Sequence, residues 1–305
     1  MRLRVLGSGA GGGVPQWNCR CDLCQLARVG SGLVRHRTHA SVAISADGAR
    51  WLVCNAGPDI HAQIEAFPPL LPQVGARGTG IAAIALTGAD LDQVLGLLLL
   101  REGAPLRLYG TATVREALDG GLRLLPTLAA YCGADWCDLP LEEEQVVVDS
   151  AGAPLGLRLR AFAVAGGPPP YAGQRSAGRP GDTIGLLIED EAQGCSVAYV
   201  PSCGAVTAAL LAVLGSVDCV LFDGTLWRDD EIAVLGVSGR TGRSMQHLPL
   251  AGPDGALQRL RPLTNRRILT HINNTNPLLR EGGSERDVVA ALGWEVAHDG
   301  LEVSL

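Results

Sequence analysis

The sequence predicts an α/β fold in which two β-sheets are sandwiched between helices. Hydrophobic residues make up 47% of the 305 residues and charged residues only 18%, which is enough apolar material for a large buried core and excludes a disordered chain. Strand-like segments dominate the early part of the chain, and strands and helices then alternate twice over. No linker-like segment interrupts the middle, so residues 1–305 are expected to form a single domain.

Hydrophobic periodicity and turn residues define the expected elements. Polar and apolar residues alternate in the first strand, Arg2–Leu6, which runs into a glycine-rich loop at residues 7–13. Asp47-Gly48 is a favoured hairpin turn between strands at 40–45 and 50–55. Pro68 and Pro69 close a helix at 60–67, and a buried strand at 81–86 precedes a helix at 92–100. Further strands are expected at 106–109, 145–148, 155–164, 183–188, 196–200, 217–222, 268–270, 294–297 and 301–305, and helices at 111–118, 205–214 and 284–291.

Charge and composition exclude several classes of partner. A net charge of -6 argues against a protein that holds a phosphate backbone, so no nucleic-acid partner is expected. The apolar stretches fall short of the roughly 20 residues that a membrane span needs, so no membrane insertion is expected. The N-terminal segment carries no apolar signal region, and the nine cysteines are typical of reduced thiols. These features predict a cytoplasmic protein.

The glycine-rich loop matches a dinucleotide-binding pattern without its context. Residues 7–12, GSGAGG, fit G-x-G-x-x-G after a strand. The chain then continues into Val14-Pro15 instead of a helix, so the loop is interpreted as a tight turn that lets backbone segments approach closely.

Three cysteines form the most specific motif. Cys19, Cys21 and Cys24 make a C-x-C-x-x-C run within a cysteine-rich loop at residues 17–26, and thiolates this close can converge on one Zn²⁺. Sulfur-rich closed sites are usually structural, so a structural zinc is predicted. The fourth ligand is left open among His36, His39 and the Asn273-Asn274 region, and the other six cysteines are expected to be buried thiols.

The segment TGADLDQVLG at residues 87–96 fits the T-H-x-H-x-D-H-x-x-G metal motif of the metallo-β-lactamase superfamily. Gly88, Asp90 and Gln93 stand at its three histidine positions, while Asp92 keeps its place. The cysteine run extends the resemblance, and so do the segments LGSG, LLLLREG, YVPSCG, LFDGTLW, GRSMQHLP and LTHINNTNPL. Together they span residues 7–278, and the chain resembles one family, the coenzyme pyrroloquinoline quinone (PQQ) synthesis protein B family.

The resemblance implies a four-layer αβ/βα sandwich with a metal site on loops at one edge of the sheets. It also implies an activity similar to that of an iron-dependent hydroxylase, which adds oxygen to the tyrosine ring of a cross-linked Glu-Tyr product of a precursor peptide. The expected partner is therefore a small molecule, either this Glu-Tyr derivative or another quinone precursor. The oligomeric state stays open, with a homodimer as one option.

The ligand set that the resemblance implies is incomplete here. In the superfamily the H-x-H pair holds one metal, and the Asp-His pair with a late histidine holds a second. Gly88 has no side chain to donate, so at most one cleft metal is expected, with Asp92 and His271 as ligands and Asp90 and Gln93 as further donors. Mixed histidine and carboxylate ligands with open positions favour Fe²⁺. The neutral amide of Gln93 is a weaker ligand than the family's usual histidine, and Asp90 either binds the metal or supports a ligand.

Asp223 and His247 are the predicted catalytic pair. They occupy places comparable to a carboxylate and a histidine in the RNase Z branch of the superfamily. If the two meet, Asp223 fixes the imidazole tautomer, and His247 acts as acid or base or binds substrate. A metal-ligand role for Asp223 is the alternative.

Two arginine-bearing loops, 35–37 and 175–179, are candidates for binding the carboxylates of a quinone precursor. The glycine- and proline-rich stretch 166–179, which contains Tyr171, is interpreted as a mobile flap over the cleft. Two other functions remain as alternatives: a non-enzymatic carrier that helps deliver the quinone or its precursor toward the periplasm, and a metal-dependent hydrolase.

Overall fold

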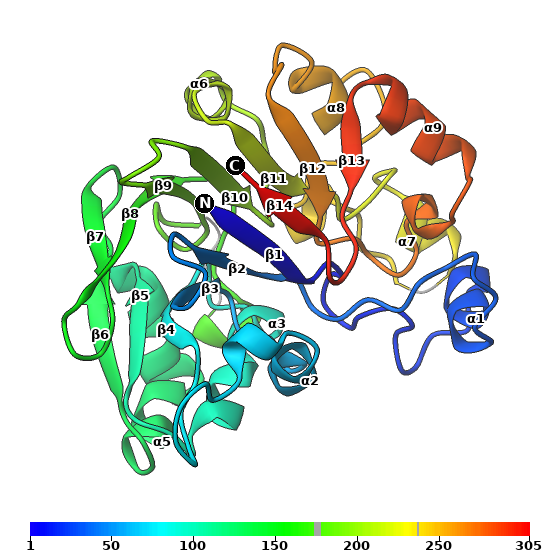
Figure 1. Cartoon of the computed structure of the whole chain (residues 1–305). Coiled ribbons are helices and arrows are strands. Elements are labelled where there is room, and N and C mark those ends of the chain that lie inside the picture. Colours follow the sequence, from blue (N-terminus) through cyan, green and yellow to red (C-terminus); the bar gives the residue numbers. More distant parts are fainter. Residues whose placement is uncertain (174–177, 237) are drawn as a thin grey trace.

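Two seven-stranded sheets carry the fold of the part of the chain that the computed structural model describes, which is residues 1–173, 178–236 and 238–305. The sheets pack face to face with helices outside them, which confirms the predicted sandwich (Figure 1). The first sheet has the order β14 (Glu302–Ser304), β1 (Arg2–Gly7), β2 (Ser41–Ser45), β3 (Trp51–Cys54), β4 (Ile81–Ala85), β5 (Leu106–Gly110) and β6 (Ala134–Asp138). The second has the order β13 (Trp294–Val296), β12 (Arg266–Thr270), β11 (Cys219–Asp223), β10 (Ser196–Val200), β9 (Ile184–Asp190), β8 (Pro154–Ala163) and β7 (Glu144–Val148).

Short helices cover the outer face of each sheet. Those packed against the first sheet are α2 (Ile60–Glu65), α3 (Leu91–Val94), α4 (Ala112–Glu116) and α5 (Leu124–Ala129). Those packed against the second are α6 (Ala208–Gly215), α8 (Ala256–Arg259) and α9 (Ser284–Ala291). Two more short helices among the described residues are α1 (Asp22–Arg28) and α7 (Glu231–Val234).

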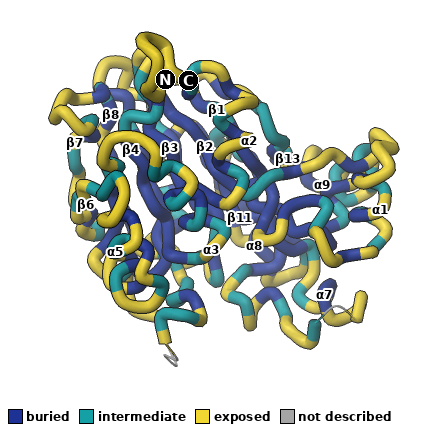
Figure 2. The backbone as a smooth tube through the Cα atoms, turned by 90° about the horizontal axis from the view of Figure 1, so that it is seen from below, coloured by how far each residue is buried: buried dark blue, intermediate teal, exposed yellow. Residues whose placement is uncertain are grey.

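The main apolar core lies between the two sheets. Leu3 and Val5 of β1 share it with Leu157 and Leu159 of β8, because alternate residues of a strand point to the same face. Two further apolar clusters fill the space between each sheet and its helices. Figure 2 shows the buried strands running through the middle of the molecule, with exposed residues on the surrounding loops.

Most predicted strands are present, but β6 and α5 were not predicted. β6 is an edge strand whose residues are only half-buried or exposed, so it has no apolar face for the periodicity to reveal. α5 contains Pro126 in its first turn, where a missing backbone N–H costs little. The expected helix at 92–100 is α3 followed by a 3₁₀ helix, Leu95–Leu100.

The strand ends bring distant segments to one edge of the sandwich. β10, β11 and β12 run parallel, and Asp223 pairs with Thr270, which places Asp223 beside the residue that follows β12. β4 leads into the segment that begins at Thr87. The Asn55 side chain accepts a hydrogen bond from the Thr87 backbone (2.9 Å) and donates one to its hydroxyl (2.8 Å), so it fixes the start of this segment.

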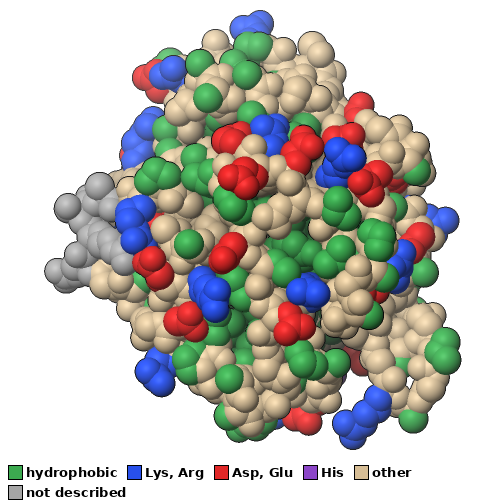
Figure 3. Space-filling model, turned by 90° about the vertical axis from the view of Figure 1, so that its left-hand side faces the viewer, with side chains coloured by type: hydrophobic (Ala, Val, Ile, Leu, Met, Phe, Trp, Pro, Cys, Tyr) green, Lys and Arg blue, Asp and Glu red, His purple; other side chains and the backbone are tan. Residues whose placement is uncertain are grey.

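The surface shows no gathering of one charge on the face drawn in Figure 3, where Arg side chains alternate with Asp and Glu. Within the described residues, no helix is long and apolar enough to cross a membrane.

The Asp299 carboxylate joins the glycine-rich loop to the segment before β2. Its Oδ1 accepts hydrogen bonds from the backbone and hydroxyl of Ser8 (2.9 and 2.7 Å), and its Oδ2 accepts from the backbone and hydroxyl of Thr38 (2.7 and 2.8 Å). One carboxylate therefore sets the path of two segments that reach the cleft.

Replacing Asp299 with alanine is expected to lower the free energy of unfolding by about 3 kcal/mol, because hydrogen bonds to a charged group contribute roughly 1.5–3 kcal/mol each and do not add fully. Urea denaturation of both proteins measures the difference. Asp135→Ala, at an exposed position of β6, is the matched control and should change stability by less than about 0.5 kcal/mol. Equal losses in the two variants would contradict this role.

Candidate active site and metal centres

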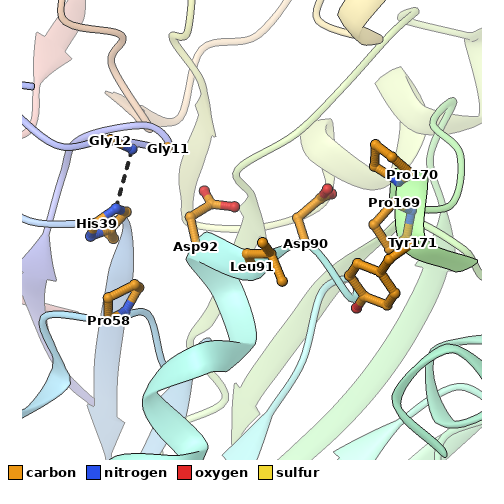
Figure 4. A pocket seen from close by; sticks show the side chains of 10 residues that line it. All are labelled: Gly11, Gly12, His39, Pro58, Asp90, Leu91, Asp92, Pro169, Pro170 and Tyr171. Atoms are coloured by element: carbon orange, nitrogen blue, oxygen red, sulfur yellow. Dashed lines mark hydrogen bonds between the residues drawn. The ribbon is translucent and has the colours of Figure 1, made fainter. Parts of the chain in front are cut away.

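A cavity of about 790 Å³ opens at the edge where the strand ends meet. A smaller pocket of about 460 Å³ adjoins it, and Asp90 and Asp92 line both (Figure 4). The larger cavity is also lined by predicted site residues and by the loops that face them: Gln93, Gly167, Pro168, Ser202, Thr225, Arg240, Gln246, His247, His271 and Asn273.

Asp90 and Asp92 lie at the start of α3. Asp90 is the residue that precedes the helix, and Asp92 lies in its first turn. Figure 4 shows both carboxylates pointing to the same side. Burial and the neighbouring Asp92 charge raise the pKa of Asp90 to about 6. Burial also disfavours the Asp92 carboxylate, but the hydrogen bond to His271 and the charges of His271 and His39 outweigh it, so the pKa of Asp92 lies below its usual range.

His271 follows β12 in a left-handed conformation, φ 56°, which turns its ring into the cleft. Its Nδ1 lies 2.7 Å from the Thr225 hydroxyl oxygen, and that hydroxyl lies 2.6 Å from Asp223 Oδ1. The Thr225 hydroxyl also lies 3.0 Å from the His271 carbonyl oxygen, but its contact with the charged Asp223 carboxylate is shorter. We therefore assign its single proton to the hydrogen bond with Asp223, which makes His271 Nδ1 the donor to Thr225. In the neutral ring, Nε2 is then without a proton.

With a neutral imidazole, His271 Nε2 and Asp92 Oδ2 are consequently both acceptors, whereas a charged imidazole donates the hydrogen bond that lowers the pKa of Asp92. His271 Nε2 lies 3.1 Å from Asp92 Oδ2, a distance that needs a shared cation or a charged imidazole. Two ligand atoms held about 2.1 Å from one divalent cation and at right angles to each other lie about 3.0 Å apart. The donor set therefore fits a metal ion between Asp92 and His271.

Gln93 occupies the space that a longer residue at position 88 would need. A Cβ on Gly88 would lie 2.7 Å from Gln93 Oε1, so the end of the Gln93 side chain would have to move for a larger residue at position 88. Gln93 is buried, and its Oε1 has no hydrogen-bond partner among the described residues. An unpaired buried carbonyl oxygen at the cavity wall fits a weak additional donor to the same metal.

Asp223 and His247 meet, as their sequence context suggested. His247 Nδ1 donates to Asp223 Oδ2 at 2.7 Å, and the Cys203 backbone N–H donates to the same oxygen at 2.8 Å. Asp223 Oδ1 accepts from the backbone and hydroxyl of Thr225 (3.0 and 2.6 Å). Both carboxylate oxygens accept hydrogen bonds, which fits an orienting role for Asp223. The Asp223 oxygen and the nitrogens of His247 and His271 also lie within 4.8 Å of one another, so a metal-ligand role for Asp223 stays as the alternative.

The charge distribution supports an orienting role for Asp223. Burial opposes both charges, but the mutual attraction of the pair holds the pKa of Asp223 below its usual range and that of His247 above it. Because Nδ1 of His247 is bound to Asp223, Nε2 is the nitrogen left for the cleft. The His247 and His271 rings stack with centroids 5.3 Å apart.

Sequence reasoning missed Thr225 and the pair of His39 and Asp59. Thr225 lies two residues after Asp223, but a threonine carries no metal-ligand or nucleophile signal by itself. His39 was expected to be a surface or core histidine, or a zinc ligand; instead it lines the smaller pocket, with its Nδ1 2.5 Å from Asp59 Oδ2.

The predicted carboxylate-binding arginines that the structure describes, Arg35, Arg37 and Arg179, do not line either cavity. Arg35 pairs with Glu281 at 3.2 Å, and Arg37 is buried and donates to Ser8 Oγ at 2.7 Å. Arg179 pairs with Glu116 at 2.7 Å, while Arg175 lies outside the described residues. Arg240 is the arginine that lines the larger cavity among the described residues.

The expected flap over the cleft corresponds in part to residues that line it. Gly167, Pro168 and Pro170 form one wall of the larger cavity, and Tyr171 donates a hydrogen bond to the Ala89 carbonyl. Residues 174–177 of this stretch lie outside the described residues.

The three motif cysteines converge as predicted for a zinc site. The sulfur atoms of Cys19, Cys21 and Cys24 lie within 4.8 Å of one another. Cys24 belongs to helix α1, so the expected loop at 17–26 is only a loop up to Cys21. Burial raises the pKa of Cys21 to about 12. Burial also opposes the Cys19 thiolate, but hydrogen bonds from the Cys21 backbone and neighbouring side chains lower the pKa of Cys19.

Asn274 is the candidate fourth ligand that contacts these sulfurs. Its side-chain Nδ2 donates to Cys24 Sγ at 3.4 Å, and its backbone carbonyl oxygen accepts from Cys21 Sγ at 3.7 Å. His36 Nε2 is instead hydrogen-bonded to the Ala27 carbonyl at 3.0 Å, and His39 is held by Asp59. Three converging thiols fit Zn²⁺, and the fourth ligand stays open, with Asn274 the candidate that contacts the sulfurs.

Replacing Cys21 with serine is expected to remove about one equivalent of zinc and to lower the melting temperature, because three thiolates can no longer close around the ion. Elemental analysis of the purified proteins measures the zinc content. Cys132→Ser is the matched control, since that thiol lies outside the cluster, and Asp92→Ala should also keep this zinc. Unchanged zinc in the Cys21 variant would refute the assignment.

Comparisons with known proteins agree with this geometry. A beta-lactamase superfamily domain matches residues 50–272. The chain is similar to coenzyme PQQ synthesis protein B of Methylococcus capsulatus (42% identical over 307 residues) and of Azotobacter vinelandii (44% over 306), in each case over 100% of both chains. Among solved structures, Zn²⁺-bound PqqB from Methylobacterium extorquens superimposes with a TM-score of 0.90 at 41% identity over 100% of both chains. A diphosphatase of the PhnP family, at 20% identity over 99% of this chain and 97% of its own, shares the fold with a TM-score of 0.69.

Proposed function

The chain belongs to the coenzyme PQQ synthesis protein B family of the beta-lactamase superfamily, and on this premise we propose that it acts in PQQ biosynthesis as a mononuclear, iron- and O₂-dependent hydroxylase. Its substrate in this proposal is the tyrosine ring of a cross-linked Glu-Tyr precursor. The observation that carries the proposal is the Asp92–His271 pair, whose Oδ2 and Nε2 atoms face each other at 3.1 Å. With Gly88 in place of a histidine and its space filled by Gln93, the cleft supports one metal and not a pair.

The residues around the pair supply binding and proton handling. Asp92 and His271 would hold the iron, with Asp90 and the Gln93 amide oxygen as further donors. Bound iron would supply the activation of O₂ that amino-acid side chains cannot provide. His247, oriented by Asp223, presents Nε2 to the cleft and can hold or accept a proton there. Thr225 keeps Asp223 and His271 in their hydrogen-bonding roles.

Arg240 supplies the positive charge that a polycarboxylate substrate requires. It lines the larger cavity next to acidic Asp90, and it forms no ion pair within the described part of the chain. Guanidinium groups bind carboxylates through two parallel hydrogen bonds. A substrate carboxylate placed at Arg240 would leave the ring free to extend toward Asp92.

Anaerobically loaded wild-type protein is expected to consume O₂ when the cross-linked Glu-Tyr substrate and a reductant such as ascorbate are added. Asp92→Ala should lower this rate at least about 100-fold and lose the cleft iron, because one of its charged ligands is gone. An oxygen electrode, mass spectrometry of the product and elemental analysis measure these effects. Asp254→Ala, at an exposed surface position, is the control.

Three results would contradict the hydroxylase. One is wild-type protein that binds no cleft iron and uses no O₂. A second is tight quinone binding that Asp92→Ala leaves unchanged, which indicates a carrier. The third is metal-dependent turnover of bis-p-nitrophenyl phosphate, which indicates a hydrolase.

Arg240→Gln is expected to raise KM for the Glu-Tyr substrate about tenfold or more with a smaller change in kcat, because a charged hydrogen-bond pair contributes roughly 1.5–3 kcal/mol to binding. Steady-state oxygen uptake at varied substrate concentration separates the two constants. Arg243→Gln is the matched control on the same loop, since Arg243 is exposed and is not among the residues that line the cavity. Equal KM values for the two variants would exclude Arg240 from substrate binding.

A further inference from the structure

The smaller pocket contains a second histidine–aspartate pair that the proposed reaction has not used. Asp59, just before α2, accepts two hydrogen bonds from His39: one from Nδ1 at 2.5 Å and one from the backbone N–H at 3.0 Å. Figure 4 shows the His39 ring on one side of Asp92, with Asp90 and Tyr171 on the other. The side chain of His39 is only 13% exposed, so its ring is held in place and faces the pocket.

The hydrogen bonds define which ring nitrogen is available. Burial opposes a charge on the His39 ring, but the hydrogen bond and charge of Asp59 outweigh it and raise the pKa of His39. In the neutral ring, the form present above this pKa, Nδ1 donates to Asp59 and Nε2 is an acceptor. In this structure it receives the backbone N–H of Gly12 at 3.2 Å (Figure 4). Gly12 is exposed, so water can satisfy its N–H when another donor takes its place at Nε2.

Close packing at Gly57 brings His39 next to the iron-binding segment. A Cβ at this position would lie 2.3 Å from the Asp92 carbonyl oxygen and 2.8 Å from His39 Cβ. Only glycine therefore allows His39 and Asp92 to approach each other across this residue. A group bound at Nε2 lies in the same pocket as the Asp92 carboxylate.

The remaining walls suit a flat aromatic ring. Pro58, Leu91, Pro169 and Pro170 line the pocket with apolar surface, and its volume of about 460 Å³ has room for one ring. Asp90 and Asp92 line the pocket as proposed metal ligands, which leaves His39 Nε2 as the side-chain acceptor for an organic ligand among the described lining residues. Such a pocket favours a ring that carries hydrogen-bond donors.

We propose that His39, fixed by Asp59, is a substrate-binding residue whose Nε2 accepts a hydrogen bond from a hydroxyl of the substrate ring, so that the smaller pocket selects phenols and catechols. The inference rests on the proposed function and assigns the hydroxyl-bearing end of the substrate to this pocket. Arg240 and His39 then hold the two ends of the substrate, a carboxylate and a ring hydroxyl.

Anaerobic binding titrations of the iron-loaded protein test the inference without turnover. The ligands are the cross-linked Glu-Tyr compound and its deoxy analogue, in which phenylalanine replaces tyrosine. Wild-type protein should bind the hydroxylated compound about tenfold more tightly, the effect of one hydrogen bond to a buried acceptor. His39→Asn keeps a partner for Asp59 but has no atom at Nε2, so it should lose this preference. His39→Gln places an amide oxygen near Nε2 and should retain most of it.

His61→Asn is the matched control, because His61 lies on α2 two residues from Asp59 and is 79% exposed. It should keep the full preference for the hydroxylated ligand. A His39→Asn protein that still discriminates tenfold, or a wild-type protein that does not discriminate, would overturn the inference. A merely structural role of His39 would weaken both ligands equally.

Failure of the proposed function gives a different pattern. If the wild-type protein binds neither Glu-Tyr compound, p-cresol and 4-methylcatechol are compared with toluene by ligand-detected NMR. Binding of the hydroxylated rings that His39→Asn abolishes would support the pocket assignment while rejecting the Glu-Tyr substrate. Absence of such binding would overturn both.

Discussion

The arrangement of the cleft depends on one proton, the hydroxyl hydrogen of Thr225. Asp223 Oδ1 accepts the hydrogen bond of this hydroxyl at 2.6 Å. His271 Nδ1 is then the donor to the Thr225 hydroxyl oxygen. The consequence reaches both sides of the cleft: Asp223 accepts hydrogen bonds at both oxygens and orients His247, while His271 turns a bare Nε2 toward Asp92. The neutral Thr225 side chain thus distinguishes two roles: Asp223 orients His247, while Asp92 faces the unprotonated nitrogen of His271, where a metal ion would bind.

The loss of the superfamily's first metal position is a change of shape as well as of ligands. Gly88 removes a donor, and the side chain of Gln93 takes up the space that a larger residue at position 88 would need. A side chain at position 88 would therefore require the Gln93 amide to move. The pocket beside His39 then remains for an organic ligand, next to a single charged pair, Asp92 and His271.

Local sequence patterns predicted most of the fold and which side chains gather at the cleft and at the cysteine cluster, but not the hydrogen-bond network between them. The strands with a buried face, the convergence of Cys19, Cys21 and Cys24, and the contact of Asp223 with His247 all followed from pattern or from resemblance. β6 escaped prediction because an edge strand has no apolar face to reveal it. Thr225 and His39 were not predicted because their roles depend on partners distant in the sequence. Thr225 contacts His247 and His271, which are 22 and 46 residues away, and His39 contacts Asp59, which is 20 residues away. Such contacts arise from strand register and loop packing, which a single sequence does not display.

The segment after β12 contacts both the cleft and the cysteine cluster. His271 faces the cleft, and Asn274, three residues later, touches the sulfurs of Cys21 and Cys24. Between them, the Asn273 backbone donates to the Thr225 carbonyl at 3.1 Å, and Asn276 anchors the end of the turn on the Gly224 carbonyl at 2.8 Å. The cysteine cluster therefore helps to hold the segment from His271 to Asn276 in place. The position of the His271 imidazole in the cleft thus depends in part on contacts outside the cleft.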